Sequence, residues 1–161
     1  MTGSDVLAVV GHSGVVIPPE ISLEDLTEEF TALLKNVDWY TQWLYDFRDI
    51  LGNRQVVFPY CSILLDANRD PADLDECVPV RDVFGRPIYR SAYEPSPSMR
   101  AAWSDKYLKP FHRGIEENIS AGAGLLFDGH STVTARGVAA NQIDLMNFQQ
   151  TDREEKPLYY C

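Results

Sequence analysis

Basic residues and cysteine are both scarce in this sequence. It has 14 Lys and Arg residues against 24 Asp and Glu residues, which gives a formal net charge of −10 at pH 7. Because proteins bind phosphate groups mainly through Lys and Arg, this balance argues against a nucleic-acid partner. The three cysteines, Cys61, Cys77 and Cys161, are widely spaced and form no Cys-x-x-Cys pair. This usage fits a reducing cytoplasm better than a disulfide framework, so we expect a cytoplasmic protein.

Long apolar runs are also missing. No stretch is long enough to span a bilayer, and the amino end lacks the basic region and long apolar core of a signal peptide. We therefore expect no membrane partner, and the composition points to no particular oligomeric state. The 161 residues, 45% of them hydrophobic, are enough for one domain with a substantial core.

Short apolar runs alternate with segments of helical pattern along the chain. Ser22 and Asp25 resemble a capping box that opens a helix over about residues 23–34. Pro97 is placed to begin a long helix that ends near residue 119, with a kink at Pro110. The other expected elements are an amphipathic segment over 39–51, an apolar run over 56–65, a loop with one short hairpin over 70–93, and a strand that begins near 157. This alternation indicates an α/β fold with a mostly parallel sheet.

Two of the three histidines occupy nearly identical settings. Residues 6–11 precede His12, and residues 125–129 precede His130. Each run is short, apolar and closed by glycine, which is typical of a buried strand that ends in a turn. Parallel strands bind ligands beyond their carboxyl ends, so we expect both imidazoles to face one crevice. A single histidine at a strand end is more often a packed or capping residue, but two imidazoles and a carboxylate form the ligand set of a catalytic zinc.

The remaining ligand of such a zinc must come from another part of the chain, because no His-Glu-x-x-His motif is present. Asp38, in the sequence Asn-Val-Asp-Trp-Tyr, stands at an expected helix start, where a carboxylate also serves as an N-cap. Asp128 precedes His130 by two positions and is placed to orient that imidazole as a hydrogen-bond acceptor.

Asn68 and Arg69 offer a different chemistry. Arg69 presents a planar fork of donors suited to a carboxylate, and Asn68 adds a neutral amide beside it. If the strand before this pair ends in the same crevice as the metal, Asn68 and Arg69 would anchor an acidic substrate there. The alternative is that Arg69 only balances its acidic loop, whose nearby members are Asp70, Asp73 and Asp75.

Several other residues have simpler interpretations. Ser13 and Ser131 lie beside histidines, but adjacency in sequence does not provide the geometry of a catalytic triad. His112 falls within the long helix and is expected on a helix face rather than on a metal. A spacing of four positions predicts a buried helix face for three aromatic residues, Trp39, Trp43 and Phe47.

Taken in order, a series of motifs resembles the N-formylglutamate amidohydrolase family. The motifs are Gly11-His-Ser-Gly, Val37-Asp-Trp-Tyr-Thr-Gln-Trp-Leu-Tyr-Asp-Phe, Leu65-Asp-Ala-Asn-Arg-Asp-Pro, Gly85-Arg-Pro-Ile-Tyr, Arg100 to Tyr107, Pro110-Phe-His and Asp128-Gly-His-Ser. The likeness covers about residues 6–131. No single motif is specific, but their common order is.

This resemblance implies a three-layer αβα fold with a mostly parallel mixed sheet, of the phosphorylase/hydrolase-like type. The zinc carboxypeptidases and the aspartoacylase-type deacylases share that fold. The resemblance also implies zinc-dependent hydrolysis of a short amide on an acidic amino acid, such as N-formyl-L-glutamate. Carried over residue by residue, it implies a metal site and a substrate-carboxylate clamp: His12, Asp38 and His130 for the metal, and Asn68 and Arg69 for the clamp.

The resemblance leaves the general base unassigned. Family members are longer, and a catalytic glutamate is expected in their additional part. We therefore expect residues 1–161 to be a single domain that is incomplete at its carboxyl end. Within the chain, Glu94 and Asp128 are the candidate bases. Two alternatives stay open: a non-catalytic metal- or ligand-binding α/β domain, and a related zinc peptidase or deacylase.

Overall fold

The computed structural model describes residues 5–82 and 84–130. The chain divides into two units, residues 1–130 and 131–161, and all described residues belong to the first. Ser131 and the strand expected near residue 157 therefore lie outside the described residues. The described elements are β1 (Val6–Val10), η2 (Leu23–Asp25), α1 (Phe30–Leu33), η3 (Leu34–Asn36), α2 (Thr41–Leu44), α3 (Arg48–Leu51), η4 (Gly52–Arg54), β2 (Gln55–Val57), α4 (Leu74–Cys77), η5 (Ser91–Tyr93), α5 (Pro97–Trp103), η6 (Ser104–Leu108), α6 (Lys109–Ser120) and β3 (Leu125–Asp128).

The described strands form a parallel sheet in the order β2-β1-β3. β1 is central, wholly apolar and almost wholly buried, as expected for a parallel strand covered on both faces. β3, predicted to be buried, is only partly so, and Leu125 at its start is 49% exposed, because β3 lies at an edge of the described sheet. The parallel α/β prediction is confirmed for these strands; the three-layer arrangement and a mixed sheet stay predictions.

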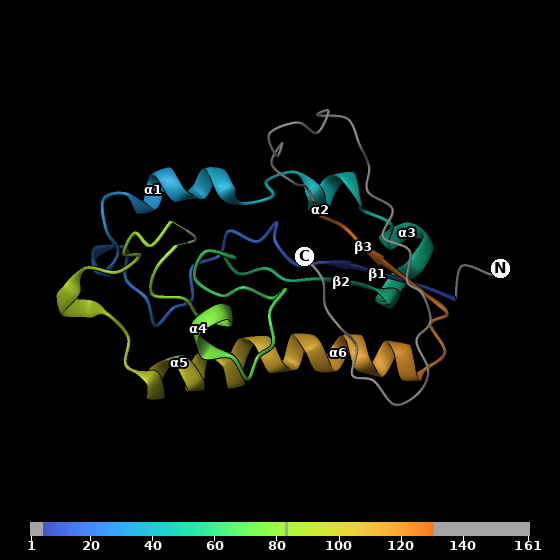
Figure 1. Ribbon diagram of the computed structural model, residues 1–161. Helices are drawn as coiled ribbons and strands as arrows, with labels where there is room; N and C mark the ends of the chain where they lie inside the picture. Colours follow the sequence, from blue (N-terminus) through green and yellow to red (C-terminus); the bar gives the residue numbers. More distant parts are fainter. Residues whose placement is uncertain (1–4, 83, 131–161) are drawn as a thin grey trace. The chain divides into compact units, whose positions relative to one another are not determined.

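Helices flank the strands on two sides in Figure 1, with α5 and α6 along one side and α1, α2 and α3 along the other. The long helix predicted from Pro97 is confirmed as the continuous run of α5, η6 and α6. Ser96 caps its start by accepting the Met99 N–H. A π-helical turn, Ser104–Leu108, lies just before Pro110, where the sequence predicted a kink. Proline has no backbone N–H to donate to the preceding turn, which favours an irregular turn at this point.

The helix predicted from Ser22 is wrong in its extent. The capping box is present, since Ser22 accepts the Glu24 N–H and Asp25 accepts the Ser22 N–H. The helix nevertheless stops after one 3₁₀ turn and the backbone at Leu26 is extended; helical structure returns only at α1, within the end of the predicted range. Leu26 instead forms an antiparallel bridge with Tyr89, so a tertiary pairing prevails over the local helix signal.

The interpretation of the aromatic repeat over 39–51 as core is wrong. Trp39 and Trp43 are 40% and 62% exposed. The segment forms two short helices, α2 and α3, and the chain turns between them. Tyr45 and Phe47 from this turn, both half-buried, pack edge-on against Phe127 of β3, so these aromatic contacts come from the turn and not from a helix face.

The loop over 70–93 contains the expected short hairpin. Arg81 and Pro87 form an antiparallel bridge, and the Ile88 N–H donates to the carbonyl of Val80 over 3.0 Å. Gly85, at φ 78°, lies within this turn, where a residue without Cβ is favoured. In the described part of the chain, no helix is both long and apolar enough to cross a membrane.

Candidate metal and substrate site

His12 and His130 lie together at the carboxyl end of the sheet. β1 and β3 are parallel neighbours, so the residues that follow them emerge at the same edge. The centroids of the two imidazole rings are 4.7 Å apart, and the ring planes are nearly perpendicular, at 82°. The structure thus brings the two sequence-predicted histidines into one site.

Asp38 joins this pair. One ligand atom each from His12, Asp38 and His130 lies within 4.8 Å of the others, and all three residues are half-buried. The Asp38 N–H donates to the carbonyl of His12 over 3.2 Å, which ties the Asp38 backbone to the loop after β1. The N-cap residue of α2 is Tyr40, so Asp38 does not occupy the capping position considered from the sequence.

Asp66, which the sequence interpretation missed, orients His12. Its Oδ1 lies 2.6 Å from His12 Nε2 and also accepts the Asn68 N–H over 2.9 Å. Burial acts to raise the pKa of Asp66, but the hydrogen bond and charge of His12 and the N–H of Asn68 bring it below its ordinary value. A usable signal was present, because Asp66 directly follows the apolar run that ends at Leu65.

Asp128 plays the corresponding part for His130. His130 Nδ1 lies 2.6 Å from Asp128 Oδ1. Burial acts to lower the pKa of His130, whereas its hydrogen bond to Asp128 and the nearby charges of Asp128, Asp38 and Asp66 raise it, and the raising contributions prevail. Of the two roles considered from the sequence, the geometry therefore matches the orienting acceptor rather than a general base.

The donor set fits a zinc ion. Each imidazole uses one ring nitrogen for a carboxylate, so its other nitrogen remains as a ligand, and such pairing fixes the tautomer of metal-binding histidines. His130 Nε2 is buried and has no hydrogen-bond partner. Two imidazole nitrogens and the Asp38 carboxylate are ligand types that zinc accepts, and three protein ligands leave a position open.

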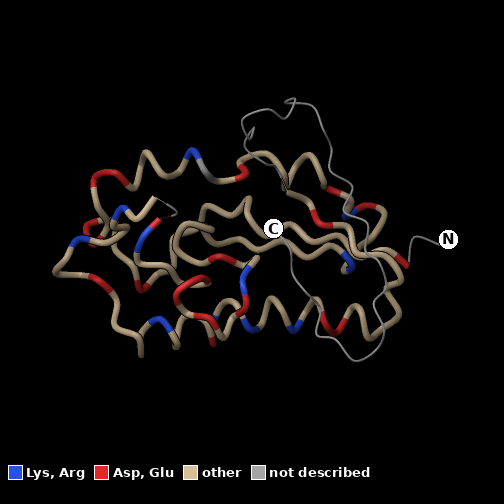
Figure 2. Tube along the Cα trace, in the orientation of Figure 1, with Lys and Arg blue, Asp and Glu red and all other residues tan. Residues whose placement is uncertain are grey.

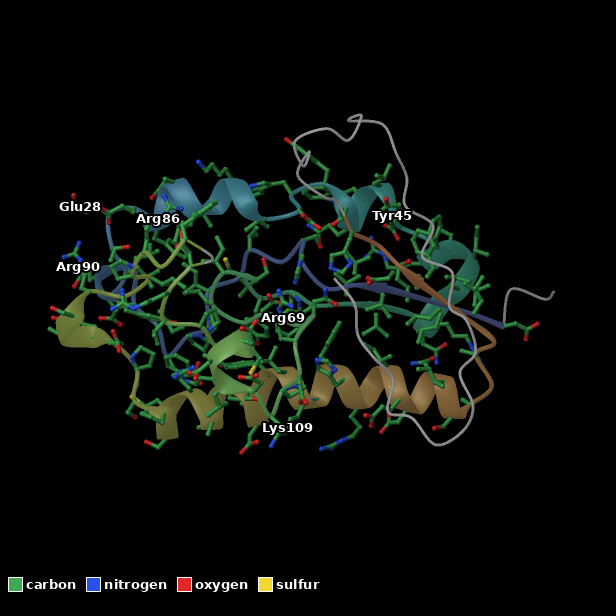
Figure 3. The ribbon with its side chains drawn as sticks, in the orientation of Figure 1. Glu28, Tyr45, Arg69, Arg86, Arg90 and Lys109 are labelled. Atoms are coloured by element: carbon green, nitrogen blue, oxygen red, sulfur yellow. The ribbon has the colours of Figure 1, made fainter. Side chains whose placement is uncertain are left out.

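Arg69 lies on the turn that carries Asp66, and Figure 3 shows it next to α4. Its Nε is 3.5 Å from Asp66 Oδ2 and 3.6 Å from Glu76 Oε2. Three further acidic residues of this loop also make contacts: Asp70 accepts from the Ala72 N–H, Asp73 caps α4, and Asp75 pairs with Arg100. The Asn68 N–H donates to Asp66, so one carboxylate supports both His12 of the candidate metal site and this turn.

Glu94 lies elsewhere. It is an exposed residue that follows η5, and it is not part of the group that His12, Asp38 and His130 form. His112 lies on α6, as expected, and burial lowers its pKa despite a hydrogen bond to the Ala67 backbone. Ser13 is fully buried and its Oγ has no hydrogen-bond partner, so no serine–histidine pair forms with His12.

Comparisons with known proteins point to one family. A sequence profile described as N-formylglutamate amidohydrolase matches residues 4–155. An N-formylglutamate deformylase from Pseudomonas aeruginosa is 31% identical over 132 residues, which cover 74% of this chain and 49% of that protein. The chain thus spans about half the length of this curated relative. No solved structure matches. Because the profile covers nearly the whole sequence, the chain belongs to the N-formylglutamate amidohydrolase family.

Proposed function

We propose that this chain contributes the zinc site and the substrate-carboxylate clamp of an enzyme that hydrolyses the amide bond of an N-formyl acidic amino acid, such as N-formyl-L-glutamate. The observation that carries the proposal is the grouping of His12, Asp38 and His130 within 4.8 Å, in a chain of this family. The three-layer αβα arrangement implied by the resemblance is part of the same proposal.

In this proposal the three residues hold zinc through the atoms that their neighbours leave for it. His12 would bind through Nδ1, because its Nε2 faces Asp66, and His130 through Nε2, because its Nδ1 faces Asp128. Asp38 adds the anionic oxygen. When bound, zinc supplies Lewis-acid chemistry: it lowers the pKa of water towards ~7 and polarises a carbonyl oxygen.

Arg69 and Asn68 are proposed to hold the substrate's carboxylate. Figure 2 shows acidic residues spread along the trace, and the formal net charge is −10, so the overall field repels an acidic substrate. A local guanidinium at the site overcomes this repulsion and fixes the orientation of the substrate. Holding the amide near the metal converts hydrolysis into an effectively intramolecular step.

No general base is assigned within the described residues. Asp128 is hydrogen-bonded to His130, and Glu94 is not part of the group that His12, Asp38 and His130 form. The resemblance implies a glutamate in a part of the family that this chain does not match. The ligand-binding half of the mechanism therefore rests on described residues of this chain, and none of the described residues is assigned to proton transfer.

Two measurements on the zinc-loaded chain test the proposal. The first is calorimetric titration with N-formyl-L-glutamate and with glutamate, and the second is formate release from the formylated compound. Binding of either compound at millimolar concentration or below, with formate release that exceeds the zinc-free control, is the expected result. Binding without formate release would favour the non-catalytic ligand-binding domain. No binding by either compound would remove the proposed clamp.

A further inference from the structure

Tyr45 links the turn after α2 to the end of β3. Figure 3 places it beside α2, near the carboxyl end of β3. Its ring packs edge-on against Phe127, with the centroids 5.1 Å apart. Its hydroxyl donates to the main-chain carbonyl of His130 over 3.4 Å. One side chain therefore contacts the strand and the histidine that follows it.

The backbone of Tyr45 is itself held by Gln55. Gln55 Nε2 donates to the Tyr45 carbonyl over 2.9 Å, and Gln55 Oε1 accepts the Phe47 N–H over 2.6 Å. Gln55 begins β2 and pairs in register with Ala8 of β1. The position of Tyr45 is thus fixed by the same sheet that delivers His12.

Gly129 leaves room for the Tyr45 ring. A Cβ at position 129 would lie 2.7 Å from Tyr45 Cδ2 and 3.1 Å from Val10 Cγ2. Any side chain there would push the ring away or displace the turn that carries His130. The closeness of this contact means that the ring and the turn cannot move independently.

We infer that Tyr45 is a positioning residue for the metal site, which fixes the Gly129–His130 turn so that the second imidazole meets His12 and Asp38. This inference rests on the proposed function, because it assigns a role towards the same metal. It adds a residue that contacts neither substrate nor metal. Its action goes through the backbone of His130, whereas Asp128 acts on the ring.

The test compares Co(II) binding and the visible Co(II) spectrum of wild type, Tyr45→Phe and Tyr93→Phe. Tyr45→Phe keeps the ring and removes only the hydroxyl, and the exposed Tyr93 is the matched control. Loss of one neutral hydrogen bond should weaken Co(II) binding about two- to tenfold. The intensity of the visible bands should also change, which a purely structural role with the ligand set intact would not cause. Tyr93→Phe should match wild type.

The outcomes separate this inference from the proposed function. If wild type binds Co(II) and Tyr45→Phe binds it equally well with an identical spectrum, the positioning role is wrong and the metal site stands. If wild type binds no Co(II), the proposed metal site fails, and the inference fails with it.

A second pair of variants probes the contact at Gly129. Gly129→Ala should weaken Co(II) binding more than Tyr45→Phe does, because the new methyl group displaces the ring or the turn. Combining Gly129→Ala with Tyr45→Ala removes the ring that the methyl group meets. The combined loss should therefore be smaller than the product of the two single losses. Strictly multiplicative losses would show that the two positions act independently, which would contradict the inference.

Discussion

The two histidines of the site are supported in different ways. His12 follows the central strand, and its carboxylate partner, Asp66, lies 54 positions away in the sequence. His130 follows a strand at the edge of the described sheet, and its partner, Asp128, is two positions away. The Asp66 side chain is 19% exposed and that of Asp128 37%. The same imidazole–carboxylate pair is thus built once by tertiary structure and once by local sequence.

The largest expected effect comes from removing both imidazoles. Wild type should bind about one zinc per chain, and a variant with His12→Ala and His130→Ala together should bind none, because the two strand ends form a single site. Metal analysis of protein purified without chelator measures this. His112→Gln, which changes the third histidine, is the control and should keep its zinc. Undiminished zinc in the double variant would show that the strand ends do not form the metal site.

Removing the anionic ligand should be the next largest effect. Asp38→Asn should lower zinc affinity by more than the ~10–100-fold that is typical of losing a partner of a ligand. The thermal midpoint of the metal-free protein should hardly change, because Tyr40 and not Asp38 is the N-cap residue of α2. Competition with a zinc chelator gives the affinity. The control is Asp46→Asn, which removes an exposed ion pair with Arg48 and should leave the zinc affinity unchanged. Equal zinc affinities of the Asp38→Asn and Asp46→Asn variants would exclude Asp38 as a ligand.

The two carboxylate partners test the comparison directly. Asp66→Asn and Asp128→Asn should each weaken zinc binding by about 10–100-fold. Asp66→Asn should have the larger effect and should also lower the thermal midpoint of the metal-free protein. The reason is that Asp66 is more buried and additionally supports the backbone of Asn68 and the side chain of Arg69. A larger loss of zinc affinity or of thermal midpoint in Asp128→Asn than in Asp66→Asn would contradict the greater structural role given to Asp66.

The last expected effect concerns substrate affinity at the proposed clamp and leaves the metal site unchanged. Arg69→Lys keeps the charge but loses the planar fork of donors. Loss of a charge-assisted hydrogen bond costs roughly 1.5–3 kcal/mol, so binding of N-formyl-L-glutamate should weaken about tenfold or more. Zinc content should not change. Calorimetry on the zinc-loaded proteins measures the difference, and equal affinities would return Arg69 to the role of balancing acidic neighbours.

Features set by nearby residues could be predicted from the sequence. The apolar runs that close in glycine predicted β1 and β3, and with them the convergence of His12 and His130. The proximity of Asp128 to His130 suggested its orienting contact. Pro97 predicted the start of the long helix. The physical cause of each element and of the Asp128 contact lies within a few residues, and the convergence of the histidines then follows from the parallel pairing of β1 and β3.

Features set by distant contacts could not be predicted in this way. The bond between Asp66 and His12 needs the turn after Leu65 to return to the end of β1. The helix after Ser22 ends early because Leu26 pairs with Tyr89, far along the chain. Periodicity describes only local preference, and these contacts prevail over it.

X-ray absorption at the zinc edge of the zinc-loaded chain tests the central claim most directly, because it reports which atoms bind the metal. The account predicts only nitrogen and oxygen ligands at about 2.0–2.2 Å, with the outer-shell scattering of two imidazoles. Asp38→Asn should change the first shell and leave two imidazoles in place. A sulfur ligand at about 2.3 Å, or the signal of a single imidazole, would contradict a zinc site built from the ends of β1 and β3.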